Sequence, residues 1–269
     1  MSYVTSDGIS ITLNHQEENL NASFGISYLH VSRKRNNFSR MNHNTLLTLL
    51  LILSGDIKTC PGPSNPELKN ILNGKDIHLS HQNIRGLFSK KGLIEEFLNR
   101  SKDIDILTLS ETHIDPTESN DLYKINGFSF ENKPRKSGKG GGVSVYVSDN
   151  IKYKRRKDLE NHYVEWFWLE ITPKDSKGFL VCCIYRPPDS SKFLPKDFEK
   201  KLSNILSKIS NLSCECIILG DVNVNFLSNN NKEFKQTFLL YGFKQLIKKA
   251  TRLTDRNESL IDIIATNNS

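Results

Sequence analysis

Asparagine and carboxylate side chains follow several short apolar runs of the sequence, at the points where buried strands would end. These positions are Asn83 after 77–82, Glu111 after 106–110, Asp221 and Asn223 after 217–220, and Asp262 within 260–264. A single acidic residue at a strand end is usually a helix cap or a turn former. Several oxygen ligands at equivalent strand ends instead favour a divalent-cation site, because Mg²⁺ prefers a few carboxylates together with water and phosphate oxygens.

The elements that must position these residues alternate between strand-like and helix-like patterns from residue 75 onward, which is typical of an α/β protein. Five runs, two of which overlap those named above, are short and rich in β-branched or aromatic residues, as expected of buried strands. They are 104–109, 143–147, 164–171, 179–185 and 216–219. The aromatic residues Trp166, Phe167 and Trp168 are interpreted as core rather than as a platform for stacking bases.

Three amphipathic helices are predicted between these strands. The first covers 90–100, with Ser89 as a possible N-cap and with Leu93, Ile94, Phe97 and Leu98 facing inward. The second begins near Pro195 and buries Phe198, Leu202, Ile205, Leu206 and Ile209. The third covers about 232–240 and ends near Gly242.

Residues 1–74 show no persistent helix or strand period and are interpreted as a poorly ordered leader, with a folded domain over 75–269. Segment 46–63 is similar to a ribosome-skipping (2A-like) peptide, known in viruses and in some retrotransposons. The family's tail has Glu and Asn where this chain has Lys58 and Cys60. A decayed leader, or a short secretory segment that begins at Met41, is the alternative.

Composition narrows the class of protein. The 269 residues carry a formal net charge of +7, and the pI is near 9.0, a mild bias toward a polyanionic partner. A mean hydropathy of −0.46 and the absence of an apolar run of spanning length argue against a membrane bundle. Five cysteines without paired CxxC spacing suggest reduced core thiols and an intracellular location, nuclear or cytoplasmic.

Six short motifs occur in one order along the chain. They are His81-Gln82-Asn83-Ile84-Arg85-Gly86-Leu87, Leu109-Ser110-Glu111-Thr112, Gly140-Gly141-Gly142-Val143, Ile184-Tyr185-Arg186-Pro187-Pro188, Gly220-Asp221-Val222-Asn223 and Ile261-Asp262. In this order they resemble the endonuclease/exonuclease/phosphatase superfamily, and within it the apurinic-endonuclease-like domain of non-LTR retrotransposons. The resemblance implies a four-layered α/β sandwich, in which two mixed β-sheets are flanked by helices.

The resemblance also implies a role for each matching residue. Glu111 and Asn83 would hold the metal ion, Mg²⁺ or alternatively Mn²⁺. Tyr185 would contact the scissile phosphate, Asp221 would orient or deprotonate the attacking water, and Asn223 would hydrogen-bond the developing charge on the phosphate. The implied reaction is a nick in target DNA that primes reverse transcription.

The family's Asp at the position of Asp262 orients a catalytic His that lies in a later Ser-Asp-His segment. Only seven residues follow Asp262, and none of them is His. We therefore expect a C-terminally truncated domain, without its closing strands, that is weakly active or inactive.

Basic residues are candidates for contact with the DNA backbone, although a charge run is usually a solvated face. The candidates are Arg85, Lys139, Arg155, Arg156 and Arg186. The glycine cluster 138–142 runs into a strand and lacks the Gly-Lys-Ser/Thr ending, so close backbone packing is favoured over a phosphate cradle. The alternative functions are a non-catalytic remnant that binds nucleic acid, and a phosphatase of lipids or small phosphoesters in the same superfamily.

Overall fold

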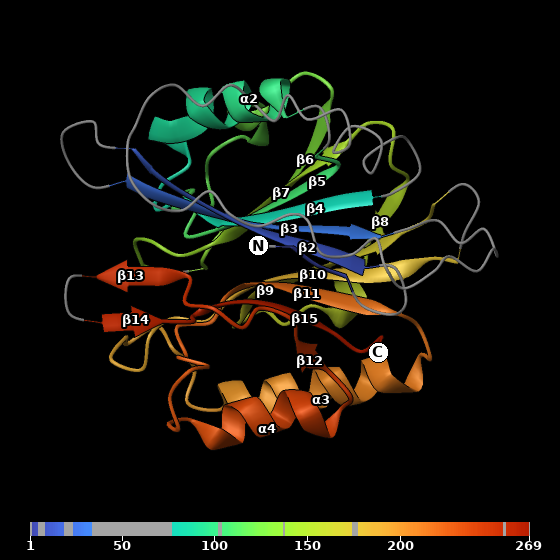
Figure 1. The fold of residues 1–269 in the computed structure, drawn as a ribbon. Helices are drawn as coiled ribbons and strands as arrows, with labels where there is room; N and C mark the ends of the chain where they lie inside the picture. The colour runs from blue at the N-terminus through green and yellow to red at the C-terminus, as the bar shows by residue number, and fades with distance from the viewer. Residues whose placement is uncertain are drawn as a thin grey trace.

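Two mixed β-sheets pack face to face, and helices cover their outer faces, so the chain forms the four layers that were expected (Figure 1). The computed structural model describes residues 2–4, 9–18, 24–33, 77–101, 104–136, 138–173, 177–254 and 257–268. The 2A-like segment 46–63 lies outside these residues. No helix among the described residues is long and apolar enough to cross a membrane.

The first sheet has seven strands in the order β1-β2-β3-β4-β5-β7-β6. Its strands are β1 (Ser2–Val4), β2 (Ile9–Glu18), β3 (Phe24–Arg33), β4 (Ile77–Asn83), β5 (Ile106–Ser110), β6 (Phe128–Lys133) and β7 (Val143–Ser148). Strands β4 and β5 are parallel, and Asn83 is the Cα partner of Ser110. The last residue of β4 therefore lies beside the residue that precedes Glu111.

The second sheet has six strands in the order β12-β15-β11-β10-β9-β8. Its strands are β8 (Tyr153–Arg155), β9 (Glu165–Ile171), β10 (Phe179–Tyr185), β11 (Cys216–Asp221), β12 (Lys244–Gln245) and β15 (Asp262–Thr266). Strands β10 and β11 are parallel and end together, with Tyr185 opposite Asp221. A separate two-stranded sheet joins β13 (Arg252–Thr254) to β14 (Asn257–Ser259).

The α-helices follow the predicted apolar stripes. Helix α2 (Lys91–Arg100) covers the first sheet, while α3 (Phe198–Asn211) and α4 (Lys232–Leu240) lie on the far side of the second (Figure 1). All five apolar residues predicted to face inward from α3 are buried. In α2 the prediction for Leu93 is wrong, because this side chain is mostly exposed, and Ser89 makes no capping bond because the N-cap position falls on Lys90.

The apolar core has three parts. One cluster fills the space between the two sheets, a second lies between the second sheet and α3 with α4, and a third lies under α2. Successive residues of β9 face different clusters: Trp166 and Trp168 pack toward α3, and Phe167 packs between the sheets. Burial on both faces explains why these strands are continuous apolar runs. The interpretation of the two tryptophans as core residues agrees with their burial.

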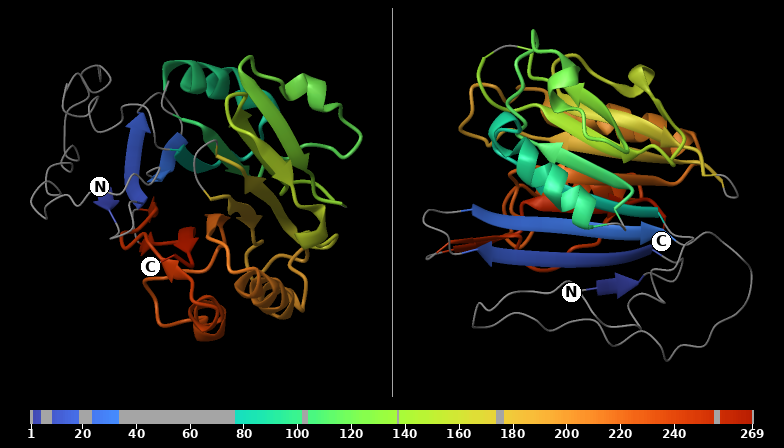
Figure 2. Two further views of the ribbon diagram at one scale, coloured as in Figure 1. Left: turned by 90° about the vertical axis from the view of Figure 1, so that its right-hand side faces the viewer. Right: turned by 90° about the horizontal axis from the view of Figure 1, so that it is seen from above.

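Strands β1, β2 and β3 differ from the expectation of a leader without strands. Strand β3 pairs antiparallel with β4 from Arg33↔Ile77 to Leu29↔His81, so residues before 75 extend the first sheet (Figure 2). The segment Ile9-Ser10-Ile11-Thr12-Leu13 does alternate with period two, and this signal was overlooked because the neighbouring residues are polar. The domain boundary at residue 75 itself stays a prediction.

Candidate active site

Three of the predicted residues are joined by the side chain of Asn83, which comes from the end of β4. Its Nδ2 donates to Oε1 of Glu111 at 2.8 Å and to Oδ2 of Asp221 at 2.7 Å. Glu111 follows β5 of the first sheet, whereas Asp221 ends β11 of the second. The amide group therefore bridges the two sheets at the edge where their parallel strands end.

Asp221 is the most enclosed of these acids, with 2% of its surface exposed. Burial raises the pKa of its carboxyl well above the usual range, and the neighbouring Asp262 adds to this increase. Asp262 is the Cα partner of Asp221 across β15, and burial raises its pKa to about 6. Two acids packed side by side are electrostatically unfavourable without a cation, so their arrangement suits a site that takes positive charge.

Tyr185 and Asn223 complete the group. Burial raises the pKa of the Tyr185 phenol, and the charges of Glu111 and Asp221 raise it further. The backbone N–H of Asn223 donates to Oδ1 of Asp221 at 2.9 Å, and its Nδ2 donates to the carbonyl oxygen of Arg186 at 3.0 Å. The structure thus places all six residues proposed as catalytic around one edge of the sandwich.

The oxygen Oδ1 of Asn83 is the atom best placed to accept a further ligand. It is buried and accepts no hydrogen bond from the residues that the structure describes, whereas the nitrogen of the same amide donates to Glu111 and Asp221. A buried acceptor without a donor is unfavourable, and a divalent cation would satisfy it. Among the described residues, no cluster of three or more His, Cys, Asp or Glu has the arrangement of a metal site. A cation here would therefore depend on the amide oxygen as well as on carboxylates.

Four residues around the site hold a left-handed backbone without being glycine. They are Arg85, Glu111, His113 and Asn223, with φ between 45° and 55°. Asparagine and histidine adopt this region more often than most residues, but it is uncommon for arginine and glutamate. Backbone strain of this kind often marks functional sites, where the surrounding structure holds it in place.

Glu165 and Arg135 belong to the same neighbourhood and were not predicted. Nε of Arg135 donates to Oε1 of Glu165 at 2.8 Å, and Oε2 of Glu165 accepts from the backbone N–H of Gly142. Burial raises the pKa of Glu165. Its place at the start of β9 could have been inferred, because β9 runs antiparallel to β10 and so begins where β10 ends.

The histidines take different places. His81 is fully enclosed, with its Nδ1 3.0 Å from Oγ1 of Thr108, and burial lowers its pKa to about 3, so it is a neutral core residue. His113 is exposed, and its Nε2 lies 3.6 Å from Oε2 of Glu111.

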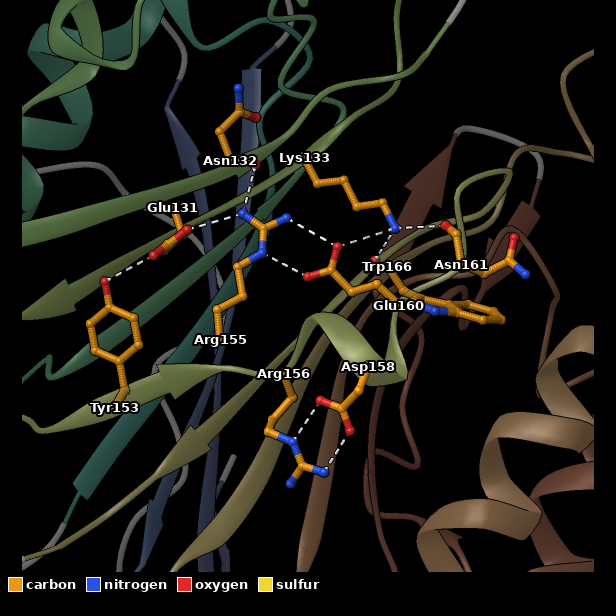
Figure 3. A network of polar contacts seen from close by, with 10 residues as sticks. All are labelled: Glu131, Asn132, Lys133, Tyr153, Arg155, Arg156, Asp158, Glu160, Asn161 and Trp166. Carbon is orange, nitrogen blue, oxygen red and sulfur yellow. Dashed lines mark hydrogen bonds and ion pairs between the residues drawn. The ribbon is translucent and has the colours of Figure 1, made fainter.

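The five basic residues proposed to contact DNA are not equivalent. Arg155 forms ion pairs with Glu131 and Glu160, and Arg156 forms one with Asp158 (Figure 3). Arg156 also pairs with Glu170. Arg186 is 3% exposed and contacts Asp189 and Glu199. Only Arg85 and Lys139 are exposed. Their ion pairs favour a structural role for Arg155, Arg156 and Arg186. DNA contact by any of the five basic residues stays a prediction.

The face-to-face sheets and the polar edge where their parallel strands end define the α/β sandwich of phosphodiesterases and phosphatases. The chain belongs to the Endonuclease/Exonuclease/phosphatase family, whose model matches residues 78–260. Among curated protein sequences, no match was found.

Solved structures share this fold. The endonuclease domain of TRAS1, a telomere-specific non-LTR retrotransposon, is similar with a TM-score of 0.50 and 12% identity, over 69% of this chain and 82% of that one. AP endonuclease LMAP from Leishmania major has a TM-score of 0.54 and 15% identity, over 68% and 77%. The catalytic domain of APE2 from Xenopus laevis has a TM-score of 0.52 and 16% identity, over 69% and 81%. At such identities the likeness establishes the fold.

Proposed function

We propose that this chain is a divalent-metal-dependent phosphodiesterase that nicks DNA. The observation that carries the proposal is the bridge from Asn83 to Glu111 and Asp221, together with the oxygen of the same amide, which has no hydrogen-bond partner in the described part of the chain. The family match and the order of the six motifs support it. The name of one similar structure, a retrotransposon endonuclease domain, supports DNA as the substrate.

Glu111 and Asn83 Oδ1 would hold the cation, Mg²⁺ or Mn²⁺. When bound, the cation would neutralise charge that builds on the phosphate oxygens. Both groups are oxygen donors, as a hard cation requires, and both lie at the edge shared by the two sheets.

Asp221 is the residue proposed to take the proton from the attacking water. Its raised pKa makes the carboxylate a stronger base than an exposed aspartate. The water oxygen would form a bond to phosphorus, the phosphodiester bond on the opposite side would break, and the leaving oxygen would take a proton from solvent. Tyr185 and Asn223 would donate hydrogen bonds to the phosphate.

The proposed activity of the 269-residue polypeptide is weak. Asp262 is the Cα partner of Asp221. By the resemblance it would orient a catalytic His, but the sequence has no His after His162. General acid–base groups contribute about 100- to 10,000-fold. Addition of a closing Ser-Asp-His segment from an intact relative should therefore raise nicking by a factor within that range.

The test is nicking of supercoiled plasmid by the 269-residue chain with Mg²⁺ and with EDTA. Slow, Mg²⁺-dependent nicking is expected, and Asp221→Ala should abolish it. The matched control is Asp121→Ala, because Asp121 is exposed, lies outside the residues of the site and forms its ion pair with the neighbouring Lys124. Nicking that survives Asp221→Ala, or that persists in EDTA, would contradict the proposal.

Filter binding separates the alternative functions. A DNA nuclease should bind duplex DNA with an affinity that falls steeply as salt rises. A phosphatase of small molecules should hydrolyse a soluble phosphomonoester and show no such affinity. Salt-sensitive binding without any nicking, even after the closing segment is added, would indicate a non-catalytic DNA-binding protein.

A further inference from the structure

A basic pocket of about 540 Å³ opens beside the candidate active site. It lies between the loop after β6, the turn before β9 and the segment that leads into α3. Its lining includes Lys136, Tyr163, Lys192 and Phe193, as well as Arg135 and Glu165 of the neighbouring site. The roles proposed above do not use the first four residues.

Aromatic rings and cations alternate in this pocket. Tyr163 is 68% exposed, and Nζ of Lys136 lies 5.4 Å from the centre of its ring. Phe193 lies under two cations: the Arg135 guanidinium is 4.4 Å and the Lys192 ammonium 5.2 Å from its ring centre. Phe193 is thus enclosed by side chains, whereas Tyr163 offers a ring that a ligand can reach.

The charge of the pocket is only partly neutralised. Lys133, Arg135 and Lys201 form ion pairs with Glu160, Glu165 and Asp197 respectively. In the part of the chain that the structure describes, Lys136 and Lys192 form no ion pair with a carboxylate. These two ammonium groups therefore leave a net positive charge at the mouth of the pocket, which suits an anionic ligand.

Side-chain hydrogen bonds fix the backbone of the turn that carries Tyr163. Nζ of Lys133 donates to the carbonyl oxygens of Asn161 at 2.8 Å and Trp166 at 2.7 Å, on either side of Tyr163 (Figure 3). Oδ1 of Asn161 accepts from the backbone N–H of Tyr163 at 2.9 Å. Because its backbone is fixed, the exposed ring would lose little conformational freedom when a ligand binds.

The pocket adjoins the catalytic edge. Glu165 lines the pocket and is also the Cα partner of Tyr185, the residue proposed to contact the phosphate. The Arg135–Glu165 ion pair lies between the pocket and Tyr185. A polymer bound at Tyr185 would reach Lys136 and Tyr163 with its next units.

We propose that this pocket binds a nucleotide of the DNA strand beyond the scissile phosphate, with its base against Tyr163 and its phosphate between Lys136 and Lys192. The inference rests on the proposed function. A nucleotide supplies a phosphate for the two lysines and a flat base for the Tyr163 ring. Stacking on an aromatic ring tolerates any base. An acidic peptide would satisfy the lysines but leave the Tyr163 ring bare.

The test is fluorescence anisotropy of a short labelled DNA with the full 269-residue chain, in EDTA so that no cleavage occurs. The double variant Lys136→Glu/Lys192→Glu should bind at least about tenfold more weakly. Its slope of log affinity against log salt should fall by about 2, since each lost phosphate contact contributes about 0.9. Lys208→Glu, on the exposed face of α3, is a charge-reversal control outside the pocket and should leave the slope near that of wild type.

The aromatic contact is tested separately. Tyr163→Ala should weaken DNA binding by at least about fivefold without changing the salt slope, and Tyr163→Phe should retain the affinity. The ring is exposed, so all these variants should fold, and circular dichroism checks that they do.

The outcomes separate this inference from the proposed function. If wild type binds DNA but the double variant and Tyr163→Ala both match Lys208→Glu, the pocket is not the DNA site, and the proposed function is untouched. If wild type does not bind DNA at any salt, the DNA substrate itself is wrong. Tighter binding of RNA with the same sequence would overturn the assignment to DNA.

Discussion

Asn83 shows how one side chain can serve two purposes at a site. Its nitrogen donates to Glu111 and Asp221 and so keeps two carboxylates close together, while its oxygen, which has no hydrogen-bond partner among the described residues, is the proposed ligand of a cation. Aspartate has no donor for either carboxylate, and alanine supplies neither group. The residue type therefore follows from the charges around it.

Asn83→Asp should add negative charge to the site. The variant replaces two donated hydrogen bonds with a third carboxylate, so we expect its thermal midpoint in EDTA to fall by at least about 4 °C. Mg²⁺ should then raise the midpoint more than it does for wild type, because the cation binds only the folded state. Differential scanning calorimetry measures both effects. Asn204→Asp, exposed on α3, is the control, and identical behaviour of the two variants would contradict the role given to Asn83.

Arg186 illustrates the difference between a basic residue in a motif and a basic residue on a surface. Its guanidinium lies 5.4 Å from the ring centre of Phe234 and 5.6 Å from that of Phe198, and it pairs with Glu199 at 3.1 Å. The sequence alone placed it among the DNA contacts, because a motif reveals the residue type but not its burial.

Arg186→Ala should therefore affect stability rather than DNA binding. Loss of a buried charge that pairs with carboxylates should reduce the free energy of unfolding by about 3 kcal/mol. Arg100→Ala, which removes an exposed ion pair with Glu96, should change it by no more than about 0.5 kcal/mol. Urea denaturation gives both values. A stable Arg186→Ala protein with weakened DNA affinity would restore the original interpretation.

At the scale of elements, the site depends on strands that end or begin at one edge. Parallel strands β4 and β5 bring Asn83 to Glu111, and parallel strands β10 and β11 bring Tyr185 to Asp221. These strand ends were predictable, because polar residues follow continuous apolar runs. Glu165 was not predicted, because it precedes its strand and only the pairing direction of β9 places it at the same edge.

A substitution at Gly220 tests how closely β10 and β11 approach each other directly before Asp221. A Cβ atom at this position would collide with the carbonyl oxygen of Ile184 on the neighbouring strand. Gly220→Ala should reduce the free energy of unfolding by about 3 kcal/mol, the upper end for overpacking. Gly92→Ala, at a helical position with no atom within 4 Å of the new Cβ, should instead stabilise the protein by about 0.5 to 1 kcal/mol. Equal effects in urea denaturation would contradict this account of the strand contact.

At the scale of the whole molecule, the pairing of β3 with β4 is the feature that the sequence revealed least. The buried strands and amphipathic helices after residue 75 were predictable, since their apolar periods are strong and their motifs lie at strand ends. The short strands β8, β12, β13 and β14 and the pairing before residue 75 depend on which edges meet in the fold. Local composition does not encode that information.

Removal of residues 1–74 provides a test of the domain boundary. A chain of residues 75–269 should still fold, because it contains all the residues that the structure describes in the three apolar clusters. It should also self-associate, because β4 would lose its partner β3 and present an open strand edge. Circular dichroism and light scattering measure the two properties. An unfolded product, or a protease-resistant core of the full chain that begins well before Lys75, would count against the boundary.

The central claim is that Glu111 and Asn83 form a divalent-cation site with Asp221 beside it, and titration calorimetry with Mn²⁺ tests it most directly. Wild type should bind one ion at this site, and Glu111→Gln should weaken binding at least about tenfold, since loss of even an outer partner of a metal ligand costs about that much. Glu96→Gln, on the exposed face of α2, should bind as wild type does. Unchanged affinity in Glu111→Gln would contradict the claim.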